Sequence, residues 1–163
     1  MSVTGSGKTM PLLLSIARYD GGNTTVLILP LLAMHDEYEM RARKYKLSFE
    51  TWTINSNPSA CSQIVLVAIE ACAWDALKTY IMTIIRIGRL ACIAFDEAHL
   101  LLQHLSFRPC LEMLEYLGRM STPVLLMTAM CSRRLEGKLF EQVGRKVYQV
   151  YDRRPTVPKL HTR

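Results

Sequence analysis

A run of apolar residues, 90–95, ends directly at two adjacent carboxylates, Asp96 and Glu97. The run does not alternate between apolar and polar residues, which favours a strand buried on both faces, as in a parallel sheet. Ligands of open α/β sheets bind at the carboxyl ends of such strands. The two carboxylates are therefore predicted to lie at the carboxyl edge of a buried sheet.

Predicted strands alternate with predicted helices along the whole chain. Apolar and β-branched runs bounded by turn residues indicate the strands, and apolar residues at helical spacing indicate the helices. This alternation is typical of βαβ units, so the predicted fold class is α/β, with three α/β/α layers and a mostly parallel sheet. The expected strands are 24–29, 47–53, 64–69, 90–95, 123–127 and 147–150, and the expected helices are 8–19, 33–46, 73–87, 111–120 and 133–143.

The composition is that of a single globular domain. The chain has 163 residues, of which 50% are hydrophobic and 21% are charged, enough to bury a core. The formal net charge of +6 permits a polyanionic partner without requiring one. No apolar run is long enough to cross a bilayer, and the first residues lack the apolar core of a secretion signal. We therefore expect no membrane partner.

The cysteines and histidines do not form a recognisable metal or disulfide pattern. The five cysteines are scattered, with no C-x-x-C pair and no histidine pair at ligand spacing. We expect reduced thiols in an intracellular protein of the nucleus or cytoplasm. The cysteines are Cys61, Cys72, Cys92, Cys110 and Cys131. His35, His104 and His161 are expected to be ordinary surface residues.

The segment Thr4-Gly5-Ser6-Gly7-Lys8-Thr9 has the composition of a phosphate-binding loop. Its glycines permit backbone conformations in which successive N–H groups point at one phosphate. Lys8 adds a charge for the outer phosphates, and the Thr9 hydroxyl is suited to ligate magnesium. The full pattern has glycine at position 2, where this chain has Ser2, so an ordinary Gly/Ser turn before a helix remains the alternative.

Asp96 and Glu97 complement a phosphate-binding loop. A nucleotide-bound Mg²⁺ needs a carboxylate nearby, which Asp96 would supply, and an attacking water needs a base, which Glu97 would supply. We therefore predict one nucleotide site in which Lys8, Asp96 and Glu97 carry the chemistry, with Thr9 and Asp96 at the metal.

Four further motifs follow the loop in order: Pro30-Leu31, the DEAH tetrapeptide 96–99, Phe107-Arg108-Pro109 and Thr128-Ala129. Together with the loop they resemble the first motor domain of superfamily 2 DEAD/DEAH-box helicases, and most of all the RecQ-like group. The resemblance spans essentially the whole chain. It implies a RecA-like P-loop domain over 1–151 that lacks its N-terminal strand, and a linker over 152–163 toward a second RecA-like domain in cis.

The resemblance also implies a role for each matching residue. Those in 4–9 would cradle the phosphates of ATP, Thr9 and Asp96 would hold Mg²⁺, and Glu97 would activate water. His99 and Thr128 would relay the state of the nucleotide to a groove that binds nucleic acid, which in this family is DNA. The residues matched to DNA contacts are Pro30, Glu70 and Arg108. From the residues alone, His99 could equally satisfy a backbone group, and Arg108 could equally be an ion-pair partner.

Departures from the family pattern keep a second hypothesis open. The family's T-A-T is Thr128-Ala129-Met130 here, its T-P-E is Ala68-Ile69-Glu70, and the aromatic loop after DEAH is shortened to 102–106 without a tryptophan. The first hypothesis is the ATP-binding motor domain of a DNA helicase, which is expected to be inactive as an isolated fragment because the finger arginines of the second domain supply much of the rate. The second hypothesis is a degenerate remnant that binds nucleotide or nucleic acid without hydrolysis.

The charge of the C-terminal third and one further class of P-loop protein also bear on the function. The C-terminal third is basic, which is usually a solvated face but would also suit a phosphate backbone. A third hypothesis, a small kinase, would need a lid with its own arginines and a phosphoacceptor pocket, and no segment supplies them.

Overall fold

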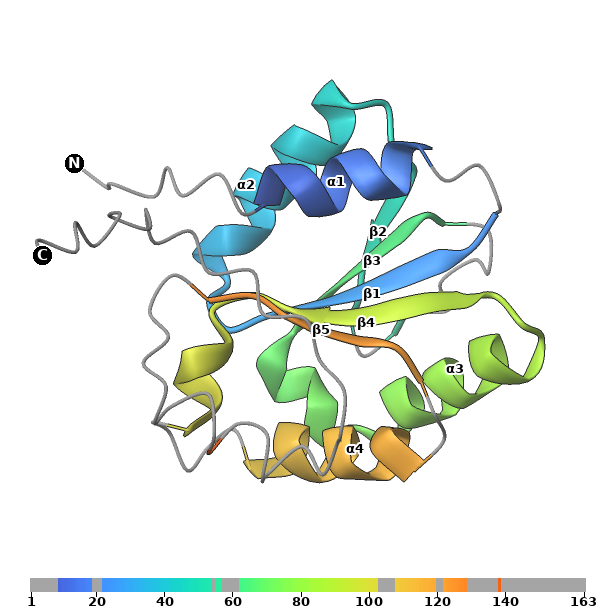
Figure 1. Cartoon of the computed structure of the whole chain (residues 1–163), viewed down its shortest axis with the longest axis vertical. Coiled ribbons are helices and arrows are strands. Elements are labelled where there is room, and N and C mark those ends of the chain that lie inside the picture. Colours follow the sequence, from blue (N-terminus) through green and yellow to red (C-terminus); the bar gives the residue numbers. More distant parts are fainter. Residues whose placement is uncertain are drawn as a thin grey trace, which may run out of the picture.

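The computed structural model describes residues 9–18, 22–53, 55–56, 62–102, 108–119, 122–128 and 138. In this part of the chain five strands form one sheet in the order β2-β3-β1-β4-β5, and every neighbouring pair is parallel (Figure 1). The strands are β1 (Thr24–Leu29), β2 (Phe49–Thr51), β3 (Ile64–Ala68), β4 (Leu90–Phe95) and β5 (Val124–Leu126).

Helices cover both faces of the sheet. Figure 1 shows α1 and α2 on one face and α3 and α4 on the other, so the predicted three-layer α/β/α architecture with a parallel sheet is confirmed. The α-helices are α1 (Thr9–Arg18), α2 (Ala33–Lys44), α3 (Asp75–Arg86) and α4 (Arg108–Arg119). The described residues also form two short 3-10 helices, η1 (Ile69–Ala73) and η2 (Ala98–Leu102).

The central strand β1 is buried at every position. It lies between β3 and β4, and its side chains point alternately into two cores. Val26 and Ile28 pack on the side of α3 and α4, whereas Leu27 and Leu29 pack on the side of α1 and α2. Because both sides are apolar, the strand needs no polar alternation, which explains the uninterrupted apolar run in the sequence.

Each covering helix contributes an apolar stripe at helical spacing. In α3 the buried residues are Leu77, Ile81 and Ile84, and the helix lies against η1 and β4. In α1 the buried residues are Leu12, Leu13 and Ile16, which pack against the side of the sheet that carries Leu27 and Ala94.

The prediction that His35 is an ordinary surface residue is wrong. His35 lies in α2 three residues before Tyr38 and seven before Ala42, and all three side chains are buried on one helix face. His35 is 7% exposed, and its Nε2 atom is buried without a hydrogen-bond partner in the described part of the chain. Charged residues on the rest of α2 obscured this face in the sequence.

Several boundaries differ from the sequence-based expectation. The strand expected over 47–53 is limited to β2, an edge strand that pairs only with β3 in the described sheet. The helix expected over 73–87 begins at Asp75, and η1 precedes it without having been predicted. The expected helix 133–143, apart from Lys138, lies outside the described residues, as do the strand 147–150 and the linker 152–163. None of the helices within the described ranges combines the length and apolar character needed to span a membrane.

Candidate functional site

The carboxyl end of β4 delivers Asp96 and Glu97 to the edge of the sheet. The backbone N–H of Asp96 donates a hydrogen bond to the carbonyl of Ile28 at 3.1 Å, so the ends of β4 and β1 are tied together. Asp96 is 7% exposed, whereas the preceding Phe95 is buried in the apolar core. The expected position of the two carboxylates, at the end of a buried parallel strand, is therefore observed.

Two hydrogen bonds hold the Asp96 carboxylate. The backbone N–H of Glu97 donates to Oδ1 at 2.9 Å, and the hydroxyl of Tyr38 donates to Oδ2 at 2.6 Å. Tyr38 is 2% exposed and reaches the carboxylate from α2, 58 positions away in the sequence. Both hydrogen bonds fix the orientation of the carboxylate. Sequence reasoning missed Tyr38, and its spacing from His35 and Ala42 was the available signal.

Glu97 has an unusual backbone conformation. Its φ is +45°, in the left-handed region that residues with a Cβ rarely adopt. The chain turns there from β4 into η2, and the side chain of Glu97 remains 26% exposed at the edge of the sheet. Such conformations cost free energy and cluster at functional sites, so this residue is a candidate for direct contact with a ligand.

The structure brings together His99 and Thr128, the two residues matched to the coupling role. His99 Nδ1 lies 2.9 Å from Thr128 Oγ1 and 3.3 Å from Glu97 Oε2. His99 belongs to η2, whereas Thr128 follows β5, and the N–H of Ala98 donates to the carbonyl of Met127 at 2.8 Å. The Nδ1 atom of the imidazole therefore contacts two side chains, and the Thr128 contact links the end of β4 to the end of β5.

The phosphate-binding segment Thr4 to Lys8 lies outside the described residues, as does the side chain of Thr9. The helix that follows is described. Figure 1 shows that α1 begins on the side of the sheet where β1 and β4 end. The N–H groups and the positive end of the helix dipole at its first turn therefore lie on the same side as Asp96 and Glu97.

The three residues matched to nucleic-acid contacts have different exposures. Pro30, directly after β1, is buried, and the exposed residues of that turn are Leu31 at 57% and Leu32 at 73%. Glu70 is exposed in η1, after the end of β3. Arg108 begins α4, and its side chain lies outside the described part of the structure.

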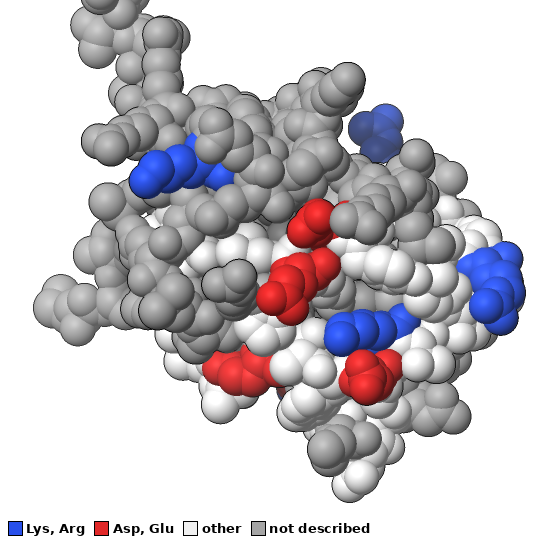
Figure 2. Space-filling model, turned by 90° about the horizontal axis from the view of Figure 1, so that it is seen from below, with Lys and Arg blue, Asp and Glu red and all other residues white. Residues whose placement is uncertain are grey.

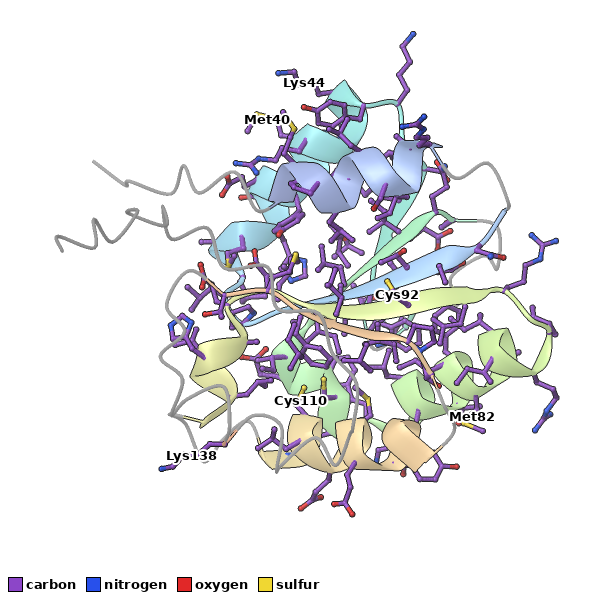
Figure 3. The ribbon with its side chains drawn as sticks, viewed as in Figure 1. Met40, Lys44, Met82, Cys92, Cys110 and Lys138 are labelled. Carbon is purple, nitrogen blue, oxygen red and sulfur yellow. The ribbon has the colours of Figure 1, made fainter. Side chains whose placement is uncertain are left out.

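A cavity of about 360 Å³ lies at the opposite edge of the sheet. It is lined by α1 and by the beginning of β1 and β4, including Asn23, Leu90 and Cys92. Figure 3 labels Cys92 at this position. Because Asp96 and Glu97 lie at the carboxyl end of β4, this cavity is separate from the candidate site.

The sequence matches the family model described as DEAD/DEAH box helicase over residues 1–136. The chain belongs to the DEAD/DEAH box helicase family. The match includes the loop, both carboxylates, His99 and Thr128, so the sheet edge described above belongs to a helicase domain.

Solved structures of another helicase share this fold. Two structures of the DUF1998 helicase MrfA, one bound to DNA and AMPPNP and one bound to DNA, each give a TM-score of 0.64 at 19% sequence identity. The alignment covers 91% of this helicase domain and 24% of the MrfA chain. The domain thus spans about a quarter of that helicase. No curated protein matches the sequence.

Proposed function

We propose that this chain is the ATP-binding motor domain of a RecQ-like, ATP-dependent DNA helicase that works with a second RecA-like domain in cis. The observation that carries the proposal is the placement of Asp96 and Glu97 at the carboxyl edge of the sheet, on the side where α1 begins. The assignment to the RecQ-like group rests on Phe107-Arg108-Pro109, which follows the DEAH tetrapeptide. We also propose an intracellular location in the nucleus or cytoplasm, because the cysteines are scattered along the sequence without a disulfide pattern.

The residues at the site fit Mg²⁺ bound with ATP. Carboxylate oxygen is a ligand type that Mg²⁺ prefers, and Tyr38 and the backbone of Glu97 hold the Asp96 carboxylate in one orientation. The metal would neutralise charge on the phosphates. Glu97 would accept a proton from the attacking water, and its contact with His99 would make the position of Thr128 and β5 sensitive to that step.

The proposed path of the nucleic acid follows the same edge of the sheet, near Leu31 and Glu70. The face formed by α3 and α4 is a poorer candidate, because acidic and basic side chains are mixed on its described part (Figure 2). Glu112 and Glu115 are exposed on α4, and Lys78 pairs with Asp75 on α3 at 3.4 Å. A backbone of phosphates needs clustered positive charge.

A non-hydrolysing remnant is the second candidate function. At the family's T-P-E position, Ala68 at the end of β3 stands where the family has threonine, so this site offers no threonine hydroxyl to a phosphate. Met130, in the family's T-A-T position, lies outside the described residues. The motor requires nucleotide binding and turnover, whereas the remnant binds nucleotide or nucleic acid without hydrolysis.

Titration calorimetry with Mg-ATP on the full chain tests nucleotide binding, which the motor requires. We expect a dissociation constant of about 1 µM or lower, corresponding to about −8 kcal/mol, and loss of the signal in Lys8→Ala. Lys44→Ala, an exposed lysine at the end of α2, is the matched control and should bind normally. A folded wild-type chain without binding would rule out the motor and leave the remnant.

Turnover separates the two candidates. The chain is joined to the second RecA-like domain of a DNA helicase of the same family, and DNA-stimulated ATP hydrolysis is measured. Hydrolysis that disappears in Glu97→Gln supports the motor, because the amide cannot accept the proton. Nucleotide binding without hydrolysis in the joined protein supports the remnant.

A further inference from the structure

Two buried cysteines meet beneath the sheet. Cys72, in η1, is 0% exposed, and Cys110, in the first turn of α4, is 1% exposed. Their Sγ atoms are 3.2 Å apart, with the thiol of Cys72 donating to the sulfur of Cys110. They are 38 positions apart in the sequence, so only the tertiary fold brings them together.

The packing that holds this pair is made by α4 lying on η1. Both sulfurs belong to the core that also contains Leu77, Leu101 and Met113. Figure 3 shows Cys110 between α4 and the sheet, with its sulfur directed toward the interior. Since η1 follows β3 without a loop, the position of Cys72 is set by the sheet, and that of Cys110 is set by the docking of α4.

We propose that Cys72 and Cys110 form a redox modification site, at which a hydroperoxide converts the two thiols into a disulfide that joins η1 to α4. The sulfurs of a disulfide are about 2.05 Å apart, so the two atoms, now at 3.2 Å, need to approach by only about 1.2 Å. The two sulfurs are therefore already neighbours in the folded chain.

The reaction consumes one peroxide and no other co-reactant. One thiolate attacks a peroxide oxygen, the O–O bond breaks, and a sulfenic acid forms with release of water or an alcohol after protonation. The sulfur of the second cysteine then attacks the sulfenic sulfur, the S–S bond forms and the sulfenic oxygen leaves as water. The two sulfurs together lose two electrons and two protons, and the peroxide gains them.

Burial of the two thiols should make their oxidation slow while α4 is docked on η1. Burial raises the pKa of the Cys110 thiol well above its ordinary value, and the neighbouring Cys72 raises it further. The thiolate is the reactive form, so oxidation requires transient loosening of α4 from η1. Once formed, the disulfide lies in the same core and is shielded from reductants. The disulfide form would therefore accumulate during prolonged exposure to peroxide rather than form within seconds.

Cys92 provides the internal comparison. It lies on β4, is more exposed than the pair, and its sulfur is 3.9 Å from the hydroxyl of Thr25 rather than beside a second sulfur. Burial also raises the pKa of this thiol. Peroxide is expected to oxidise Cys92 to sulfinic or sulfonic acid, because the described structure gives its sulfenic acid no adjacent thiol.

Peptide mapping of the full chain tests the proposal without depending on nucleotide or DNA binding. The reduced protein is treated with hydrogen peroxide, unfolded, alkylated and digested, and disulfide-linked peptides are identified by mass. We expect a Cys72–Cys110 linkage that dithiothreitol reverses. Full alkylation of both residues after Cys92 has been oxidised would overturn the proposal, and so would linkage of either residue to Cys61 or Cys131 instead.

Thermal unfolding provides an independent readout. A link across 38 positions restricts the unfolded chain, so oxidised Cys92→Ser protein should melt about 5 °C or more above its reduced form. The same comparison in Cys110→Ser should give no increase. Equal melting temperatures for oxidised and reduced Cys92→Ser protein, with the linkage present, would overturn the role as a structural link. If Cys110→Ser does not fold, the mapping of the wild-type chain still decides.

Discussion

The carboxylate of Asp96 depends on one residue from a distant helix. Tyr38 donates to Oδ2 at 2.6 Å from within the core, and the backbone of Glu97 donates to Oδ1. A hydrogen bond to a charged group contributes more to stability than one between neutral groups, and a buried acceptor that loses its donor carries a desolvation cost. The tyrosine is thus a positioning residue for the candidate metal ligand.

Replacing Tyr38 by phenylalanine removes this donor and keeps the ring. We expect Tyr38→Phe to lower the free energy of unfolding by about 1.5–3 kcal/mol at pH 7, measured by urea denaturation. The matched control is Tyr116→Phe on α4, where the side chain is 50% exposed and the change should stay within about 0.5 kcal/mol. Equal effects of the two variants would contradict the importance of the Tyr38–Asp96 bond.

His35 makes stability depend on pH. Burial lowers its pKa below the ordinary value of 6.5, because the protonated ring would lose its hydration. This effect outweighs the carboxylates of Glu39, Asp36 and Glu70, which raise the pKa. The unfolded chain therefore binds the proton more readily than the folded chain. This contribution to stability is complete above pH 6.5 and is lost as the pH falls through the lowered pKa.

A variant that cannot titrate should lose this dependence. We expect the unfolding free energy of His35→Gln to fall less than that of the wild type between pH 7.5 and 5.5, with a difference in slope of at most about 1.4 kcal/mol per pH unit. Urea unfolding at several pH values measures it, and pH 8, where both forms are neutral, supplies the reference. Parallel pH profiles would show that burial of His35 has no such effect.

At the scale of the element, α3 shows how an amphipathic helix anchors one layer. Ile81 is 0% exposed and packs against the sheet, whereas Ile87, just beyond the end of the helix, is 53% exposed. The two residues are chemically identical and lie close together in sequence. Their surroundings alone should decide what each contributes.

Truncation of the two isoleucines makes a matched pair. We expect Ile81→Ala to cost about 2–5 kcal/mol of unfolding free energy, because it removes buried methyl groups and leaves a cavity. Ile87→Ala should change stability by no more than about 0.5 kcal/mol. A cost for Ile87→Ala as large as that for Ile81→Ala would mean that α3 docks on the sheet through a different face.

At the scale of the whole molecule, charge should govern the proposed interaction with nucleic acid. The net charge of +6 includes a basic C-terminal third with Arg133, Arg134, Arg145 and Lys146. Binding through phosphates releases counterions, so affinity falls as salt rises. The face formed by α3 and α4 carries mixed charge on its described part (Figure 2), which favours a contact elsewhere on the surface.

Fluorescence anisotropy with labelled single-stranded DNA measures this dependence. Each phosphate contact contributes about −0.7 to the slope of log K against log salt concentration for single strands, and we expect a slope of about −2 or steeper. Reversal of Arg133 and Arg134 to glutamate should weaken binding and reduce the slope. The exposed Lys78→Glu on α3 is the control and should leave the slope unchanged. A slope near zero in the wild type would contradict binding through phosphates.

Much of the fold followed from local patterns. The bounds of β1 and β4 were predicted correctly, because central parallel strands are apolar on both faces and are bounded by turn residues. Edge strand β2 was predicted too long, since an element with one partner in the described sheet is limited by pairing rather than by its own composition. The short helix η1 was missed because its apolar residues continue the pattern of the preceding strand.

The sequence by itself determined the parallel α/β architecture, the DEAD/DEAH motif order and the position of Asp96 and Glu97 at a strand end, because periodicity and motif order are local properties of the chain. Tertiary structure alone decided that Tyr38 reaches Asp96, that His35 is buried and that Cys72 touches Cys110. The residues in these contacts are far apart in the sequence, and the residues that flank each of them do not indicate which partner it will meet. The contacts exist because α2 and α4 dock on opposite faces of one sheet.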